Sequence, residues 1–234
     1  MQYSRRRTLL AISLCPALLA TGCAVTSGDQ GTKSAPIRSA KEKSAGSTKA
    51  PAPKKPAEPT LPKIVDDGGM APRFLPAVRN APSRSLDQQI RIRFLPKAVE
   101  AGAPDSVPTL RALVVTDPSG VNAVFTAMGM TVWTFKWDGV KIDESRSPRL
   151  PHEVDARKLL RDLTFTLWPA EHVKSALTSD LAMEVRRGEK RETRVLRRNG
   201  KPILGALIEK RAKGSVITIE NAIEGYALTI ESAS

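Results

Sequence analysis

The chain has 234 residues, and 37 lysines and arginines against 24 acidic residues give it a formal net charge of +13. The charge is unevenly distributed. Residues 1–22 carry three arginines and no acid, residues 24–85 carry eleven basic and five acidic side chains, and residues 86–234 carry 23 and 19. A basic protein is often a nucleic-acid binder. Here most of the excess charge lies outside the segment that is apolar enough to form a core, so no nucleic-acid partner is expected.

The amino terminus has the pattern of a secretory signal peptide. Arg5, Arg6 and Arg7 precede an apolar run at 9–20, and Cys23 follows small residues. The run is shorter than the roughly 20 apolar residues that a membrane-spanning helix needs. The stretch Leu-Ala-Thr-Gly-Cys at 19–23 resembles a bacterial lipobox, so we expect residues 1–22 to be a lipoprotein signal peptide.

This reading predicts that Cys23 becomes lipidated and that Cys15 leaves with the signal peptide, so that the mature chain has no free thiol. More than one acyl chain gives stable membrane anchoring. Inner-membrane lipoproteins often have Asp directly after the lipidated cysteine, whereas Ala24 stands here. We therefore expect an outer-membrane location, with the domain facing the periplasm. Two alternatives stay open, an ordinary secreted protein with a chance cysteine and export by the twin-arginine route.

Residues 23–85 have the composition of a tether. They are rich in Pro, Lys, Ala, Ser and Gly, contain nine of the 18 prolines, and lack apolar periodicity. Such composition is typical of disordered linkers with polyproline stretches. We therefore expect the lipidated Cys23 and a disordered tether at 23–85, followed by a single folded domain at 86–234.

The domain begins with alternating strands. Ile90, Ile92 and Phe94 share one face of the first, and the pairs Asp138-Gly139 and Asn199-Gly200 are hairpin signals. About nine strands at hairpin spacing predict one antiparallel meander. The predicted strands are 90–94, 110–115, 121–127, 131–137, 140–143, 192–198, 202–209, 215–220 and 226–231.

A helical segment separates the two blocks of strands. Leu159, Leu160, Leu163 and Leu167 lie on one stripe after Asp155, which is a plausible helix cap. Pro169 ends this helix, and residues 170–177 predict a second short one. Because the leucine stripe has to be buried, we expect it to pack on a face of the sheet.

Several strands are apolar on both faces, so a curved sheet could hold a helix and still leave an apolar cavity. Trp133, Phe135 and Trp137 share one face of their strand and are our candidates for lining it. The alternative is that these aromatics form an ordinary core with the helices. From the helical side, the candidate ligand-binding residues are Leu160, Leu163, Leu167 and Trp168.

Residues 86–232 also resemble a known family. The resemblance rests on Val-Trp-Thr-Phe-Lys-Trp at 132–137, Leu-Leu-Arg-Asp-Leu at 159–163, Leu-Trp-Pro-Ala at 167–170 and Leu-Arg-Arg-Asn-Gly-Lys-Pro at 196–202. These stretches are similar to a family of bacterial lipoproteins with a domain of unknown function. That family is itself similar to the outer-membrane lipoprotein receptor LolB and its periplasmic partner LolA, and its members often accompany aryl polyene biosynthesis genes.

The resemblance implies an α+β fold. It consists of an incomplete antiparallel β-barrel with a helical hairpin packed in or over the concave face, and an apolar hollow that receives acyl chains. The long tether departs from LolB. The exposed apolar loop of LolB has no clear counterpart either, although Met128-Gly129-Met130 lies in about the right region.

No pattern for catalysis or cofactor binding is present. His152 and His172 lack the His-Glu-x-x-His spacing of zinc enzymes, and neither a nucleophile elbow nor a Gly-rich phosphate loop occurs. We therefore expect a protein that is not an enzyme and has no cofactor or metal. It would bind or carry a hydrophobic ligand such as an acyl chain, a lipoprotein or a polyene lipid. The alternative is a structural or assembly lipoprotein of the cell envelope that works through a protein partner.

Overall fold

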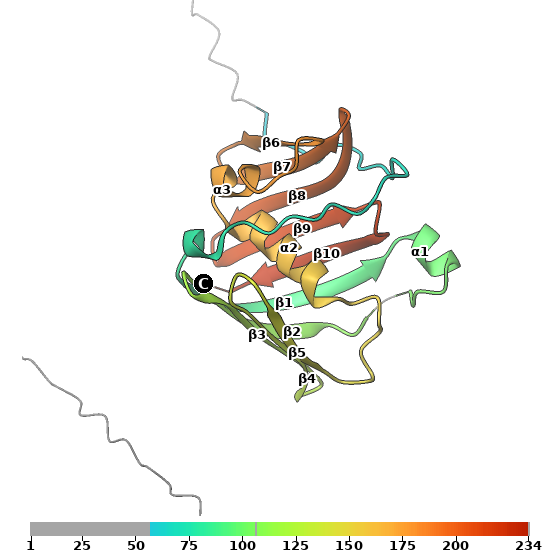
Figure 1. Cartoon of the computed structure of the whole chain (residues 1–234), viewed down its shortest axis with the longest axis vertical. Coiled ribbons are helices and arrows are strands. Elements are labelled where there is room, and N and C mark those ends of the chain that lie inside the picture. Colours follow the sequence, from blue (N-terminus) through green and yellow to red (C-terminus); the bar gives the residue numbers. More distant parts are fainter. Residues whose placement is uncertain (1–56, 106, 234) are drawn as a thin grey trace, which may run out of the picture. The chain divides into compact units, whose positions relative to one another are not determined.

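A computed structural model describes residues 57–105 and 107–233, and most of them belong to one large antiparallel sheet (Figure 1). The sheet has ten strands in the order β5-β4-β3-β2-β1-β10-β9-β8-β7-β6. Their bounds are β1 Arg84–Phe94, β2 Leu110–Asp117, β3 Gly120–Ala127, β4 Met130–Trp137, β5 Ile142–Arg146, β6 Leu181–Arg187, β7 Arg191–Arg198, β8 Lys201–Arg211, β9 Gly214–Asn221 and β10 Tyr226–Ser232.

The strand order differs from the single meander that the sequence predicted. The sheet consists of two meanders, β1–β5 and β6–β10, which join where β1 pairs with β10 in the middle. In that central pair Ile90 stands opposite Ile230, and both are fully buried. Hairpin turns specify only neighbours in sequence, so the pairing of the first strand with the last was not visible in the turns.

Strand β6 was missing from the prediction. Leu181, Met183 and Val185 alternate along it as a half-buried strand requires, and the first two are buried. The strand lies at the edge of the sheet and pairs only with β7. The charged residues 186–191 end β6, form the turn and begin β7.

Among residues 57–105 and 107–233, four helices connect or precede the strands: the 3-10 helix η1 Val78–Asn80, α1 Pro96–Glu100, α2 Ala156–Leu167 and α3 Ala170–Lys174. The predicted cap of α2 is confirmed, because an Oδ1 of Asp155 accepts a hydrogen bond from the backbone N–H of Lys158 at 2.9 Å. Helix α2 crosses one face of the sheet (Figure 1). It contacts β5, while α3 contacts β6, so the helices lie between the two edge strands of the sheet.

The sheet does not close on itself, since β5 and β6 are its two edges. One face of it forms the hydrophobic core together with α2, and buried and exposed residues alternate along β1 and β2. An antiparallel sheet with one covered face and few helices is consistent with the predicted open, barrel-like fold.

The predicted boundary at residue 86 also differs from the structure. Residues 57–83, which we call the strap, lie on the domain and were assigned to the tether. Ile64 and Phe74 are buried, and the backbone N–H of Val65 donates to the carbonyl of Pro202 at 2.8 Å. Isolated apolar side chains between prolines have no periodicity, so the sequence of this segment did not predict that it packs on the domain.

The strap follows a path from the β6–β7 turn to α2. Near its start, the carboxylate of Glu58 accepts the backbone N–H of Glu189 at 3.2 Å. Further on it passes over α2 and reaches β1 through η1 (Figure 1). Within the described part of the chain, no helix is both long enough and apolar enough to cross a membrane.

Candidate functional site

The inward side of β4 carries the three aromatic residues that the sequence singled out. Trp133, Phe135 and Trp137 are only 1%, 3% and 2% exposed. The ring of Phe125 on β3 lies 4.7 Å from that of Trp133, centroid to centroid. The indole Nε1 of Trp133 donates to a carboxylate oxygen of Glu144 at 2.8 Å, which satisfies its only polar group.

The candidate residues of α2 meet the same core. Leu160, Leu163 and Trp168 are fully buried, whereas Leu167 is half-buried at the end of the helix. The structure thus brings the two predicted sets together in one hydrophobic cluster, with side chains filling the space between them. The Nε1 of Trp168 is buried without a hydrogen-bond partner among the described residues. Such a group costs about 1–3 kcal/mol.

Helix α2 is covered on its opposite side as well. Arg161 and Phe165 are four residues apart and therefore share a face, and both are buried. The ring of Phe74 in the strap meets Phe165 edge-on at 6.0 Å between centroids. The helix is thus held between the sheet and the strap, so most of its middle residues are buried.

A network of buried polar groups lies at this second face. Arg161 donates through Nε and Nη2 to one carboxylate oxygen of Asp162 at 3.0 and 2.9 Å. Its Nη1 lies 2.5 Å from a carboxylate oxygen of Glu224 and also donates to the carbonyl of Pro72 in the strap at 3.2 Å. The hydroxyl of Tyr226 donates to the other oxygen of Asp162 at 2.5 Å. The network joins α2, the strap and the β9–β10 region.

Burial dominates the electrostatics of this network. Loss of hydration raises the pKa of Asp162, against the opposing effect of the Arg161 charge. Burial also raises the pKa of Tyr226 well above its usual value, and the carboxylate of Asp162 adds to the shift. For Arg161, burial alone would lower the pKa, but the negative charge of its neighbours raises it above the ordinary value. The guanidinium therefore stays charged inside the domain.

A second arginine holds the carboxyl end of α2. Nη1 of the buried Arg194 on β7 donates to the backbone carbonyls of Phe165 and Trp168, both at 2.7 Å. The last carbonyls of a helix lack hydrogen-bond donors within the helix, and the guanidinium of Arg194 is the donor here. Glu192 accepts from the Nε of Arg194 at 2.7 Å and holds it in place.

An apolar pocket of about 110 Å³ opens beside the tip of the β3–β4 hairpin. Leu110, Val132 and Leu150 belong to its wall, and two methionines belong to its rim. Met128 is 86% exposed and Met130 is 54% exposed. Met128 and Gly129 adopt positive φ angles of 49° and 77° in the turn between the strands. The pocket is therefore bordered by flexible apolar side chains that reach into solvent.

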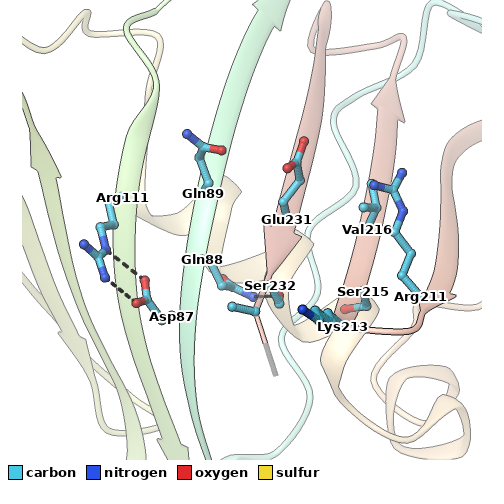
Figure 2. Close-up of a pocket in the computed structure, with 11 residues that line it drawn as sticks. Asp87, Gln88, Gln89, Arg111, Arg211, Lys213, Ser215, Val216, Glu231 and Ser232 are labelled. Carbon is cyan, nitrogen blue, oxygen red and sulfur yellow. Dashed lines mark hydrogen bonds and ion pairs between the residues drawn. The ribbon is translucent and has the colours of Figure 1, made fainter.

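A larger depression of about 400 Å³ has a different character (Figure 2). Its wall includes the ion pair of Arg111 and Asp87, which is made by two hydrogen bonds at 3.1 and 2.6 Å. Arg211 and Lys213 line the opposite side, at the β8–β9 hairpin. Because charged and polar groups form much of this wall, it does not suit a hydrophobic ligand.

The predicted lipidation site, Cys23, lies outside the described residues. Within residues 57–105 and 107–233, no group of three or more His, Cys, Asp or Glu side chains could hold a metal ion. Arg161, Asp162 and Arg194 were not among the residues predicted from the sequence. A signal for the first two was available, because Phe165 lies outside the leucine stripe and so indicates a second covered face on α2.

Residues 95–234 match the model of a family described as "Protein of unknown function (DUF3261)". The chain belongs to this family. The match begins directly after β1, so the DUF3261 region contains α1–α3 and β2–β10. The sheet of this domain nevertheless includes β1, which lies between β2 and β10. The comparison with curated proteins found no relative.

Proposed function

We propose that this protein is a lipid-anchored carrier or receptor for a hydrophobic ligand, such as an acyl chain, a lipoprotein or a polyene lipid. The ligand would lie between α2 and the inward face of the sheet, in a domain similar in fold to LolA and LolB. The lipid on Cys23 would hold the protein at the outer membrane, with the domain in the periplasm. The observation that carries the proposal is the position of α2, whose apolar side chains fill the hollow of a sheet that does not close.

Helix α2 occupies the volume that a ligand chain would take. Burying ten methylenes is worth about 8 kcal/mol, at about 0.8 kcal/mol each. Removing four buried side chains of the size of Leu or Trp from the core costs about 6–12 kcal/mol. The two quantities are similar, so an incoming chain could replace α2 without a large net change in free energy.

The polar contacts of α2 favour a movement between two defined positions. Arg161 and Arg194 fix the helix through hydrogen bonds to specific oxygen atoms. A buried ion pair loses hydration when it forms, so it recovers hydration when it opens. The helix is therefore held in one defined position while it covers the sheet. When it moves away, rehydration of the buried ionic groups offsets part of the free-energy cost.

The pocket beside the β3–β4 hairpin is the entrance that we propose for the ligand. Its rim carries the exposed Met128 and Met130, and its wall includes Leu150, which belongs to the same core as α2. Methionine adapts to apolar partners of different shape, because its side chain is unbranched and polarisable. A chain that enters here reaches the loop just before α2.

Tryptophan fluorescence tests the proposal, because all three tryptophans of the chain are buried in this core. We expect a fatty acid with a brominated chain to quench their emission, since bromine quenches on contact. The same fatty acid without bromine controls for changes of conformation. Trp133→Phe and Trp137→Phe should each remove part of the quenching.

Native mass spectrometry of the protein purified under mild conditions provides the second measurement. A bound amphiphile of reproducible mass is expected. If brominated chains leave the emission unchanged and the protein carries no amphiphile, the carrier proposal is wrong.

One observation favours the alternative of a structural or assembly lipoprotein. Trp133, Phe135 and Trp137 pack against other side chains, as in an ordinary core. In that case Trp133→Ser should destabilise the domain without changing the binding of any amphiphile, and crosslinking in cells should trap a protein partner.

A further inference from the structure

A groove of about 730 Å³ lies between the strap and the first turns of α2. Strap residues 71–75 form one side, and Arg157, Lys158 and Arg161 of α2 belong to the other. The strap crosses over α2 (Figure 1). The groove is distinct from the methionine-rimmed pocket and shares no residue with it.

The charge of this groove is predominantly positive. Four basic side chains line it, namely Arg73, Arg157, Lys158 and Arg161, against two acidic ones, Asp155 and Glu224. Both acids are engaged, because Asp155 caps α2 and Glu224 pairs with Arg161 at 2.5 Å. Lys158 reaches Glu224 only at 3.8 Å.

Two of the cations are free to meet a ligand. Arg73 and Arg157 are exposed, and neither side chain forms an ion pair or hydrogen bond with any described residue. Guanidinium groups bind phosphate and carboxylate oxygens through paired hydrogen bonds. The two arginines come from the strap and from α2, so an anion between them would contact both segments.

The rest of the groove is apolar. Pro72 and Phe74 are buried in the strap, and Leu75 packs against the core. A smaller apolar cleft shares Asp155 and Lys158 with the groove and is lined by Phe94, Leu159 and other core residues. A molecule with an anionic head at the arginines could therefore place its chain toward the core.

We propose that this groove binds the anionic head of an amphiphile, a phosphate or a carboxylate, between Arg73 and Arg157. The inference rests on the proposed function and names the class of its ligand, an anionic lipid in place of a neutral or zwitterionic one. In the bound state the first methylenes of the chain lie against Phe74 and Leu75, and the remainder lies in the hollow beside α2.

The experiment compares three single-chain lipids at concentrations below those at which they form micelles. They are palmitoyl lysophosphatidylglycerol, palmitoyl lysophosphatidylcholine and monopalmitoylglycerol, with inorganic phosphate as the fourth probe. Titration calorimetry uses the whole chain carrying Cys23→Ser, so that no acyl chain of its own competes. We expect the anionic lipid to bind at least about tenfold more tightly than the other lipids. Phosphate alone should bind more weakly than the anionic lipid.

The matched variants are Arg73→Gln/Arg157→Gln and Arg211→Gln/Lys213→Gln, which remove the same charge from two different places. The first should abolish the preference for the anionic lipid, and the second should preserve it. Both should keep the melting temperature of the parent, because the side chains replaced have no partner in the described structure.

The outcomes separate the two proposals. If all three lipids bind equally, or if the groove variant keeps the preference, the head-group inference is wrong while the carrier proposal stands. If phosphate binds as tightly as the anionic lipid, the groove is a site for free anions and the inference is also wrong. If none of the lipids binds, both proposals fail.

Discussion

At the scale of single residues, the buried contacts of Arg161 determine how α2 is held. A positive charge that is 4% exposed requires partners, and this one has Asp162, Glu224, Tyr226 and the carbonyl of Pro72. Replacing one member of such a network leaves the others buried and uncompensated, which costs more than the network contributes when intact.

We predict that Arg161→Met lowers the free energy of unfolding by about 3–5 kcal/mol, because Asp162 and Glu224 lose their buried counter-charge. Urea unfolding followed by circular dichroism measures the change. Arg91→Met is the matched control, since Arg91 forms an exposed pair with Glu231 at 3.2 Å. Its effect should stay within about 1 kcal/mol. Equal losses in the two variants would contradict the role given to the network.

At the scale of elements, α2 is held at its middle by its own Arg161 and at its carboxyl end by Arg194 of β7. Its carboxyl end depends on Arg194, and Arg194 depends on Glu192. Burial alone would raise the pKa of Glu192, but hydrogen bonds from Arg187 and Arg194 outweigh it and hold that pKa below the usual value. A carboxyl with a lowered pKa stabilises the fold above its unfolded-state pKa, and this contribution is lost as pH falls.

The corresponding prediction concerns Glu192→Gln. At pH 7 the variant should have a lower melting temperature than the parent, because Arg194 loses a charged partner. As the pH falls through the lowered pKa of Glu192, the parent carboxylate becomes protonated as well, so the two melting temperatures should converge. Scanning calorimetry between pH 7 and 3 gives the comparison, and Glu171→Gln on the exposed side of α3 controls for the loss of one charge. A difference independent of pH would show that the carboxylate charge does not hold the helix.

At the scale of the whole molecule, a folded domain follows a basic amino-terminal region that carries the predicted anchor. The strap continues that region directly onto α2, since residues 57–83 precede β1 and contact the helix through Pro72 and Phe74. An anchor at Cys23 would therefore connect to the domain through the segment that covers its helix.

Anchoring itself is tested by Cys23→Ser, which removes the only cysteine expected in the mature chain. We predict that the variant moves from the membrane to the soluble fraction after a high-salt wash, which removes attraction between the basic tether and anionic lipid. Immunoblots of the fractions report the location. Cys15→Ser is the control and should remain with the membrane. If Cys23→Ser also remains there, lipidation is not the anchor.

Periodicity and turn residues determined the local structure. Nine of the ten strands and the helices α2 and α3 in the described part of the chain follow from alternation, the Asn199-Gly200 turn, the Asp155 cap and Pro169, because these depend on neighbours in sequence. The burial of Trp133, Leu160 and Trp168 also followed, since apolar side chains on one face must leave water.

The tertiary structure alone decided which distant groups meet. The pairing of β1 with β10, the contact of Phe74 with Phe165, and the burial of Arg161 each join residues more than 60 positions apart. A charged residue beside leucines is read from sequence as a solvent-facing side chain, because the partners that make its burial tolerable are known only once the chain has folded. The location of the excess positive charge is readable from the sequence. Arg73 and Arg157, whose side chains have no partner among the described residues, form a candidate site only because the strap lies on α2.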